Sequence, residues 1–452
     1  MIHGYRSTLS VGRLLKRTTD HARRRGFCND VAEKGTHVVF LHFGLPRTEF
    51  YAKGYLRQAA AIYYQVPKNI ERFIPTSLML NGKIRNCIEK YGDSESIEDT
   101  LSRLTERIQG ALNTVMPEYE FISCSNAFLF EEPSLEQHLA DVGRGGCSRI
   151  VLMPFYPHYS CAQSGVLLNE AERVLQTFTV PATVDGKEVP NERIVPNSSE
   201  SFRVSALHRW SSHPVVSEYW LNVLQPLRGD FGGVLFCAPS LRGYNSEEYR
   251  RLVWSTCERV MSGLSDSLPW RLAFFNAWDQ WSLPIKDSVK MQAKRLSTQL
   301  PDDKFMAVVP ISSFVPDFNT FTVLPNIIQT VAEKYSELQK VVDKGRIAAR
   351  PLFICCTEAT GLLGRDKEEN RVAVQALVYD RLKFTAYCCI LSSEKEKAVL
   401  VEPQPENAVL LQGMVEVIKN HLLGRRNAQL QNRCDWCINT QCEEMRNVLV
   451  DS

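Results

Sequence analysis

Three cysteines lie close together near the C-terminal end of the sequence, at Cys434, Cys437 and Cys442. Two residues separate the first pair and four separate the second. Thiolates at such short spacings converge on one metal ion or iron–sulfur cluster, because a single turn of backbone presents several of them. Three ligands do not complete a four-thiolate site, so the fourth must come from elsewhere. On spacing alone, a structural zinc ion and an iron–sulfur cluster are equally good interpretations.

A further cysteine stands in the segment Phe155-Tyr-Pro-His-Tyr-Ser-Cys161-Ala-Gln-Ser-Gly165. This segment resembles the ferrochelatase family, whose animal-type members carry Tyr-Pro-x-Tyr-Ser-Cys-Ser-Thr-Thr-Gly and end in a C-x2-C-x4-C tail. In those members the four cysteines hold a [2Fe–2S] cluster. The resemblance therefore implies a [2Fe–2S] cluster bound by Cys161, Cys434, Cys437 and Cys442.

The composition is that of an ordinary globular protein, with 44% hydrophobic and 23% charged residues in a chain of 452. The net charge of +2 supplies no strong positive field, so nucleic acid is not an expected partner. No apolar run is long enough to span a membrane. The 14 cysteines are interpreted as reduced thiols, four of them cluster ligands, because the chain is long and shows no secretory signal.

The first 35 residues are rich in arginine and lysine, contain several hydroxyl side chains, and carry little negative charge. Leu9, Val11, Leu14 and Leu15 form an apolar stripe among them. This pattern is typical of a mitochondrial transit peptide and predicts a location in the matrix. A basic tail that binds anionic lipid is the alternative.

Apolar runs alternate with helical periodicity along the rest of the chain, which predicts an α/β fold with parallel sheets flanked by helices. The expected strands cover 37–43, 121–130, 148–155, 233–238, 270–276, 306–311 and 399–402. The expected helices cover 97–112, 165–178, 246–261, 322–342 and 408–423.

The resemblance implies two similar Rossmann-like, chelatase-type halves. We expect a first half at 36–200, a second half at 201–425, and a cluster-binding tail at 426–452. Residues 343–396 exceed the usual length of the family and are interpreted as an insertion. The apolar stretch 70–80 matches the lip of the family's pocket, which rests on the membrane. A buried helix end is an equal alternative there.

Ferrochelatases insert Fe²⁺ into protoporphyrin, which requires a base of near-neutral pKa to accept the pyrrole protons. One family histidine lies in Ser-Ala-His-Ser-Leu-Pro, where this chain has Pro239. The second family motif carries a histidine, a glutamate and a later carboxylate. Asp317, Asn319 and Val323 occupy those positions. No histidine occurs between His213 and His421, so no catalytic position of the family is intact.

Two aromatic residues match positions that line the porphyrin pocket in the family, namely Phe43 and Trp281. An apolar pocket binds porphyrin, haem or another planar ligand without catalysis. Collapse of these rings into a filled core is the alternative.

The preferred interpretation is a catalytically degenerate mitochondrial homologue that keeps its [2Fe–2S] cluster. It would bind porphyrin or haem, or act as a sensor or as a subunit of a mitochondrial assembly. Expected contacts are the inner-membrane surface, a protein complex or a second copy of the chain. One alternative is an active ferrochelatase that uses Asp317 and pocket water. Another is a purely structural partner without a small ligand.

Overall fold

The computed structural model describes residues 35–64, 72–79, 97–119, 121–196, 201–241, 246–264, 267–275, 287–301, 304–315, 317, 324 and 398–425. The expected transit peptide, the insertion 343–396 and the cysteine tail therefore lie outside the described residues. The predicted helix 322–342 does too, apart from Leu324.

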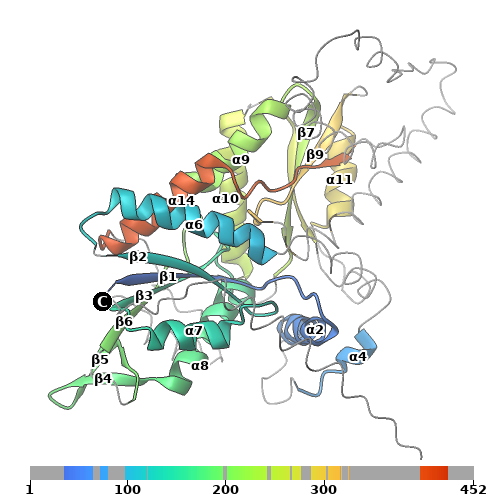
Figure 1. Cartoon of the computed structure of the whole chain (residues 1–452). Helices are drawn as coiled ribbons and strands as arrows, with labels where there is room; N and C mark the ends of the chain where they lie inside the picture. The colour runs from blue at the N-terminus through green and yellow to red at the C-terminus, as the bar shows by residue number, and fades with distance from the viewer. Residues whose placement is uncertain are drawn as a thin grey trace, which may run out of the picture.

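Most strands of the first sheet are parallel, as the apolar runs predict (Figure 1). The sheet has the order β2-β1-β3-β6-β5-β4, and only the pairs β5–β6 and β4–β5 are antiparallel. The strands are β1 (Thr36–His42), β2 (Ile122–Phe128), β3 (Arg149–Pro154), β4 (Val180–Val184), β5 (Lys187–Ile194) and β6 (Ser201–Ala206).

The hairpin β4–β5 has no counterpart among the strands expected from the sequence. Its two-residue turn is Asp185-Gly186, with positive φ values of 53° and 76°. This is the type I′ geometry that Asp-Gly pairs favour between two strands. The dipeptide was therefore the sequence signal for this hairpin.

The second sheet is wholly parallel and has the order β10-β9-β7-β8. Its strands are β7 (Phe231–Pro239), β8 (Trp270–Phe275), β9 (Phe305–Val309) and β10 (Ala398–Leu400). Each lies within two residues of an expected strand. The predicted fold class, with parallel-rich sheets flanked by helices, is confirmed.

The helices begin where the sequence provides capping groups. Ser134, Ser288 and Asn407 accept backbone N–H bonds at the starts of α7, α11 and α14. The helices are α2 (Glu49–Tyr64), α4 (Thr76–Met79), α6 (Ile97–Val115), α7 (Leu135–Arg144), α8 (Val166–Phe178), α9 (Pro214–Leu224), α10 (Ser246–Leu264), α11 (Val289–Ser297) and α14 (Ala408–Leu422), with short turns η1 (Cys161–Gly165) and η2 (Gln225–Leu227).

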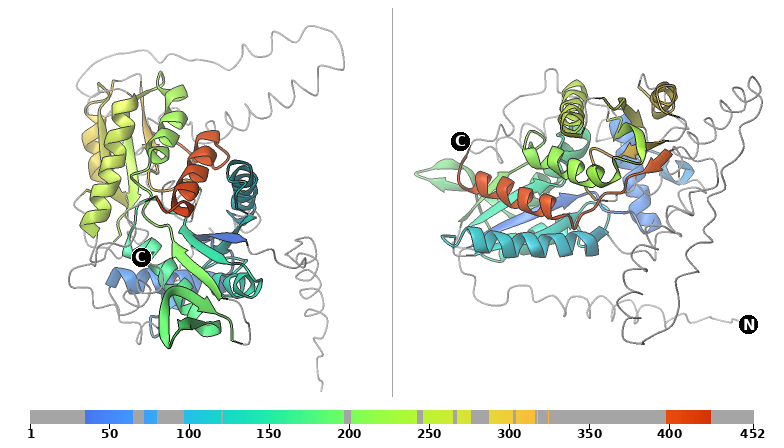
Figure 2. Two further views of the ribbon diagram at one scale, coloured as in Figure 1. Left: turned by 90° about the vertical axis from the view of Figure 1, so that its left-hand side faces the viewer. Right: turned by 90° about the horizontal axis from the view of Figure 1, so that it is seen from above.

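The two sheets enclose a shared layer of helices. Figure 2 shows α14 lying beside α6 on one side and near α9 on the other. The largest core cluster accordingly runs from Phe40 in β1, through Trp220 in α9, to Phe236 in β7. Helices α7 and α8 cover the opposite face of the first sheet, and α11 covers the opposite face of the second.

Two elements assigned to the second half by sequence lie against the first half. Strand β6 pairs with β3, so the first sheet continues to Ala206. Helix α14 packs against α6, where the Tyr119 hydroxyl donates to the Leu422 carbonyl at 2.9 Å. The halves are therefore joined by extensive packing as well as by the chain itself.

Candidate functional site

Four aromatic side chains gather where parallel strands of the first sheet end. Phe43 follows β1, Phe130 follows β2 and Tyr156 follows β3, so all three meet at one edge of the sheet. The Phe43 and Phe130 rings stack with centroids 6.1 Å apart, and Tyr156 lies 5.8 Å from Phe43. Tyr55 of α2 meets Phe130 edge-on at 5.6 Å. We call these four residues the aromatic cluster.

Phe43 thus contacts other aromatic residues while its own side chain is only half-buried. The other residue expected to line the pocket, Trp281, lies outside the described part of the chain. Asn319 and Val323 lie outside it as well.

The imidazole of His42 contacts the aromatic cluster, since it stacks on Tyr156 with centroids 5.1 Å apart. His42 is 1% exposed, and its Nδ1 accepts the Gly44 N–H at 2.9 Å. Burial lowers the pKa of His42 to about 3. The ring is therefore neutral at pH 7 and too weak a base to replace the missing histidines of the family.

Glu131 is a buried acid directly after Phe130. Its Oε2 accepts the Leu45 N–H at 2.9 Å, and its Oε1 lies 3.4 Å from the Arg47 Nε. Burial raises the pKa of Glu131 from 4.5 to about 7, although the Leu45 bond and Arg47 oppose the rise. Sequence reasoning missed this residue. The available signal was its place just past the carboxyl end of a buried parallel strand.

The second half contributes Asp317 and Tyr249, both buried. Burial raises the pKa values of the Tyr55 and Tyr249 phenols, and the Asp317 carboxylate raises them further. The pKa of Tyr156 rises for the same two reasons. Asp317 therefore acts electrostatically on groups from both halves, and the phenols stay neutral hydrogen-bonding groups at pH 7.

Pro239 is the last residue of β7, opposite Phe275 in the ladder with β8. The residue that the sequence analysis aligns with the family's first histidine is thus at the carboxyl end of a central parallel strand. Such an edge commonly supplies functional groups in α/β proteins. A pyrrolidine ring provides neither a proton acceptor nor a metal ligand there.

Cys161 begins the single turn η1, and Ser160 caps this turn by accepting the Ala162 N–H at 3.1 Å. The thiol is half-buried and forms no disulfide, which is compatible with a ligand role. Cys434, Cys437 and Cys442 lie beyond the described residues. Within the described ranges, no three His, Cys, Asp or Glu side chains are grouped as a metal site.

The segment before Cys161 anchors the first half to the second. The His158 Nε2 and the Thr256 Oγ1 of α10 are 2.9 Å apart. Arg209 lies over the Tyr159 ring at 4.7 Å and pairs with Glu248. His208 is fully buried against Tyr159, with ring centroids 4.9 Å apart.

The expected lip at 70–80 is described only from Arg72 to Met79. Phe73 is 71% exposed there, so its side chain is not part of a buried helix end. Phe50, on the neighbouring helix α2, is 80% exposed. Across the described ranges, no helix combines the length and apolar character needed to cross a bilayer.

The sequence profile of the family called Ferrochelatase matches residues 35–332. The ferrochelatase of Geotalea daltonii is 26% identical over 281 residues, which cover 60% of this chain and 78% of that protein. The mitochondrial ferrochelatase of Bos taurus is 24% identical over 205 residues, or 42% of this chain and 44% of that protein. The profile includes Cys161 and ends before the cysteine tail.

Among solved structures, DR2241 from Deinococcus radiodurans aligns with a TM-score of 0.39 at 10% identity. That protein is described as multi-domain with structural similarity to chelatases. The alignment covers 87% of this chain and 56% of that one.

Proposed function

Because the chain belongs to the ferrochelatase family, we propose that it binds a porphyrin or haem and inserts no metal. The observation that carries the proposal is Pro239 at the end of β7, in a chain with no histidine from 214 to 420. Metal insertion needs a group that accepts pyrrole protons near pH 7, and proline cannot do so.

The remaining titratable groups of the site support the same conclusion. His42 is a neutral ring with a pKa of about 3. Glu131 titrates near neutrality, but its oxygens face Leu45 and Arg47 and hold the turn after β1. From the second half, Asp317 is the buried acid that we align with a catalytic histidine of the family. An active ferrochelatase using Asp317 is therefore the less favoured function.

The aromatic cluster supports the choice of ligand. A porphyrin is a flat apolar ring, and stacked aromatic side chains pack against such a ring at low entropic cost. Neutral phenols at Tyr55 and Tyr156 can donate hydrogen bonds to the polar edge of the ligand. These residues come from α2 and from the loop after β3, so the ligand would contact several elements at once.

A titration tests this proposal. The purified chain is mixed with protoporphyrin or with haemin, and the Soret band and tryptophan quenching are recorded. Phe43→Ala should weaken binding about tenfold, which corresponds to about 1.4 kcal/mol of lost packing. Phe121→Ala removes a half-exposed ring just before β2, at the other end of that strand, and should leave binding unchanged. Absence of a spectral change with both ligands would refute the proposal.

We also propose that Cys161, Cys434, Cys437 and Cys442 hold a [2Fe–2S] cluster. The thiol chemistry of the four residues fits this group, which would supply a redox-active or purely structural centre.

The exposed rings Phe50 and Phe73 are suited to a peripheral contact with a membrane or with a protein complex. We also propose that a second copy of this chain is a partner, so that the protein forms a homodimer.

We further propose a mitochondrial location. The basic N-terminal segment supports it, and a mammalian relative carries a mitochondrial name. A fluorescent reporter fused behind residues 1–35 tests it directly. Import with cleavage is expected, whereas a diffuse cytosolic signal would argue for the lipid-binding tail or for another location.

A further inference from the structure

Among the strands that the structure describes, β8 lies at the end of the order of the second sheet and forms an edge. In the ladder with β7, Trp270 pairs with Val234, and the Val234 N–H donates to the Pro269 carbonyl. Backbone groups alternate in direction along a parallel strand. Those of Trp270 and Leu272 therefore point away from β7. Further along, the Phe274 N–H already donates to the Asp287 carbonyl at 2.8 Å.

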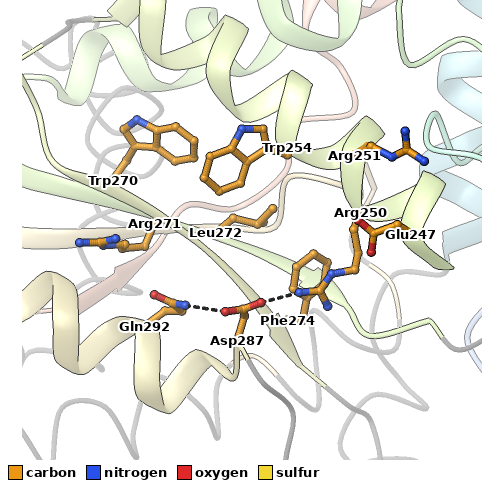
Figure 3. A pocket seen from close by; sticks show the side chains of 10 residues that line it. All are labelled: Glu247, Arg250, Arg251, Trp254, Trp270, Arg271, Leu272, Phe274, Asp287 and Gln292. Carbon is orange, nitrogen blue, oxygen red and sulfur yellow. Dashed lines mark hydrogen bonds and ion pairs between the residues drawn. The ribbon is translucent and has the colours of Figure 1, made fainter.

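A cavity of about 280 Å³ runs along this edge (Figure 3). Helix α10 contributes one wall, β8 the floor, and the start of α11 the other wall. Trp270 and Leu272 face α10, whereas Arg271 points to the opposite face of the sheet, because strand side chains alternate. The cavity thus reaches both faces of the open edge.

The wall on the α10 side is aromatic. The rings of Trp254 and Trp270 lie 4.9 Å apart at 47° to each other. Trp254 is 45% exposed, although tryptophan is one of the residues most strongly stabilised by burial. The two rings therefore form an apolar surface that is partly exposed to solvent.

The wall on the α11 side is polar and incompletely paired. Gln292 is 6% exposed, and its Nε2 donates to the Asp287 carboxylate at 3.0 Å, while its Oε1 has no hydrogen-bond partner. The Arg271 Nε is also buried without a partner. Among its described lining residues, the cavity therefore presents one unpaired acceptor and one unpaired donor. A ligand with both an N–H group and an anionic oxygen would satisfy them.

The charge of the lining favours an acid. Arg250 is already neutralised by Asp287 at 2.5 Å and lies over the Phe274 ring. Of the remaining charged residues in the lining, Arg251 and Arg271 outnumber Glu247, which leaves one net positive charge.

We infer that the β8 edge binds an acidic segment of another protein, which adds to the second sheet as an extended strand. An added strand pairs with the outward backbone groups of Trp270 and Leu272. Its side chains alternate between faces, so apolar residues would meet Trp254 and Trp270, and acidic residues would meet Arg271. The Gln292 Oε1 would accept a backbone or side-chain N–H of the segment. This inference does not depend on porphyrin binding.

The test uses the purified full-length chain and the blocked peptide acetyl-Glu-Val-Glu-Val-Glu-Val-amide, with affinity measured by calorimetry. Two further peptides serve as comparisons. One has Gln in place of each Glu, and the other is methylated on every backbone nitrogen, which keeps the charge but removes the N–H donors that strand pairing needs. We expect only the first peptide to bind, and more weakly in 0.5 M salt (about 4 Å screening length).

Three variants complete the experiment. Arg271→Gln and Trp254→Ala should each weaken binding about tenfold, since each removes a principal contact. Arg228→Gln removes an exposed arginine outside the cavity and should change affinity less than about twofold. Circular dichroism checks that each variant folds. Equal binding of the methylated peptide, or an equal loss with Arg271→Gln and Arg228→Gln, would show unspecific charge attraction and overturn the inference. So would no binding of the first peptide at about 1 mM.

Discussion

The proposal that this chain inserts no metal rests on Pro239 and Asp317, which we align with the catalytic histidines of the family. Positioned proton transfer contributes roughly 10²–10⁴ in rate, so we expect the replacement of its acceptors to remove most of the metal-insertion activity. Asp317 is buried and acts on the buried phenols of Tyr55 and Tyr156. These phenols are neutral at pH 7, so they do not form a proton relay by themselves. Residues that act together in catalysis also fail together, so single restorations are expected to be silent.

The first prediction concerns metal insertion. The unmutated chain and Pro239→His should both fail to insert zinc into a soluble porphyrin, measured by fluorescence beside an active ferrochelatase. Rescue should require Pro239→His, Asp317→His and Asn319→Glu together. Turnover by the unmutated chain within about tenfold of the active enzyme would instead establish the Asp317 mechanism.

The second prediction follows from the Glu131 pKa, which burial raises from 4.5 to about 7. Between these values the unfolded carboxyl loses its proton while the folded one keeps it. Folding is therefore most favourable below about pH 4.5 with respect to this group, and stability falls as pH rises towards 7. The loss is about 3 kcal/mol. Glu131→Gln should flatten this part of the stability profile.

Urea unfolding at several pH values between 5 and 8 measures the effect, in steps of about one pH unit. The control is Glu132→Gln, which alters the exposed neighbour and leaves Glu131 in place. It should keep the original pH dependence. An unchanged slope in Glu131→Gln would mean that another group causes it.

At the scale of elements, the end of β1 and the turn after it bring His42 and Phe43 to the site. Gly44 has a φ of +78°, and a Cβ added there would lie 2.6 Å from the Glu131 Cβ. Gly186, in the β4–β5 hairpin, has nearly the same φ of +76° but open space around it. Substituting alanine at these two positions therefore separates the cost of a positive φ from the cost of steric overlap.

The third prediction uses this pair. Gly186→Ala should cost about 1 kcal/mol of unfolding free energy, because only the positive φ is unfavourable. Gly44→Ala should cost about 1–3 kcal/mol more, since the turn must also move away from Glu131. Denaturant midpoints provide the comparison. Equal losses would show that the turn moves without cost.

Helix α14 depends on a second close approach. A Cβ on Gly413 would lie 2.0 Å from the Val215 Cγ2 of α9, whereas one on Gly110 of α6 would meet nothing within 4 Å. As the fourth prediction, Gly413→Ala should destabilise the fold by about 1–3 kcal/mol. Gly110→Ala should stabilise it by about 0.5–1 kcal/mol, the helix propensity difference. Thermal melts test this prediction, since the melting temperature should fall in Gly413→Ala and rise in Gly110→Ala.

At the scale of the whole molecule, a helix from near the end of the chain closes the space between the two sheets. Helix α14 contacts both α6 and α9, and the residues after 425 lead on to the cysteine tail. A cluster shared between Cys161 and that tail would tie the first half to the end of the chain. Loss of the cluster is then expected to lower the stability of the protein as well as to remove its colour.

The fifth prediction is that the purified chain is red-brown and contains about two irons and two inorganic sulfides. Cys161→Ser should remove the visible absorption and the sulfide. Cys147→Ser, which changes another half-buried thiol, should retain both. Zinc without labile sulfide would contradict the cluster.

Local patterns in the sequence predicted the α/β class and most strands of the two sheets, and they placed the helices α6, α8, α10 and α14. They did not predict the strands β4, β5 and β6 or the helices α2, α7, α9 and α11. Apolar runs and helical periodicity are properties of neighbouring residues, and they predicted β7 and α10 closely. The spacing of Cys434, Cys437 and Cys442 and the lack of histidine from 214 to 420 were likewise visible without a fold.

Only the tertiary structure decided which distant residues meet. Asp317 acts on Tyr55 and Tyr156 although more than 150 residues separate it from either. The near-neutral pKa of Glu131 arises mainly from burial, which no spacing encodes. The open edge of β8 likewise depends on strand order. Burial and strand order are set by long-range packing, and a single sequence records them only indirectly.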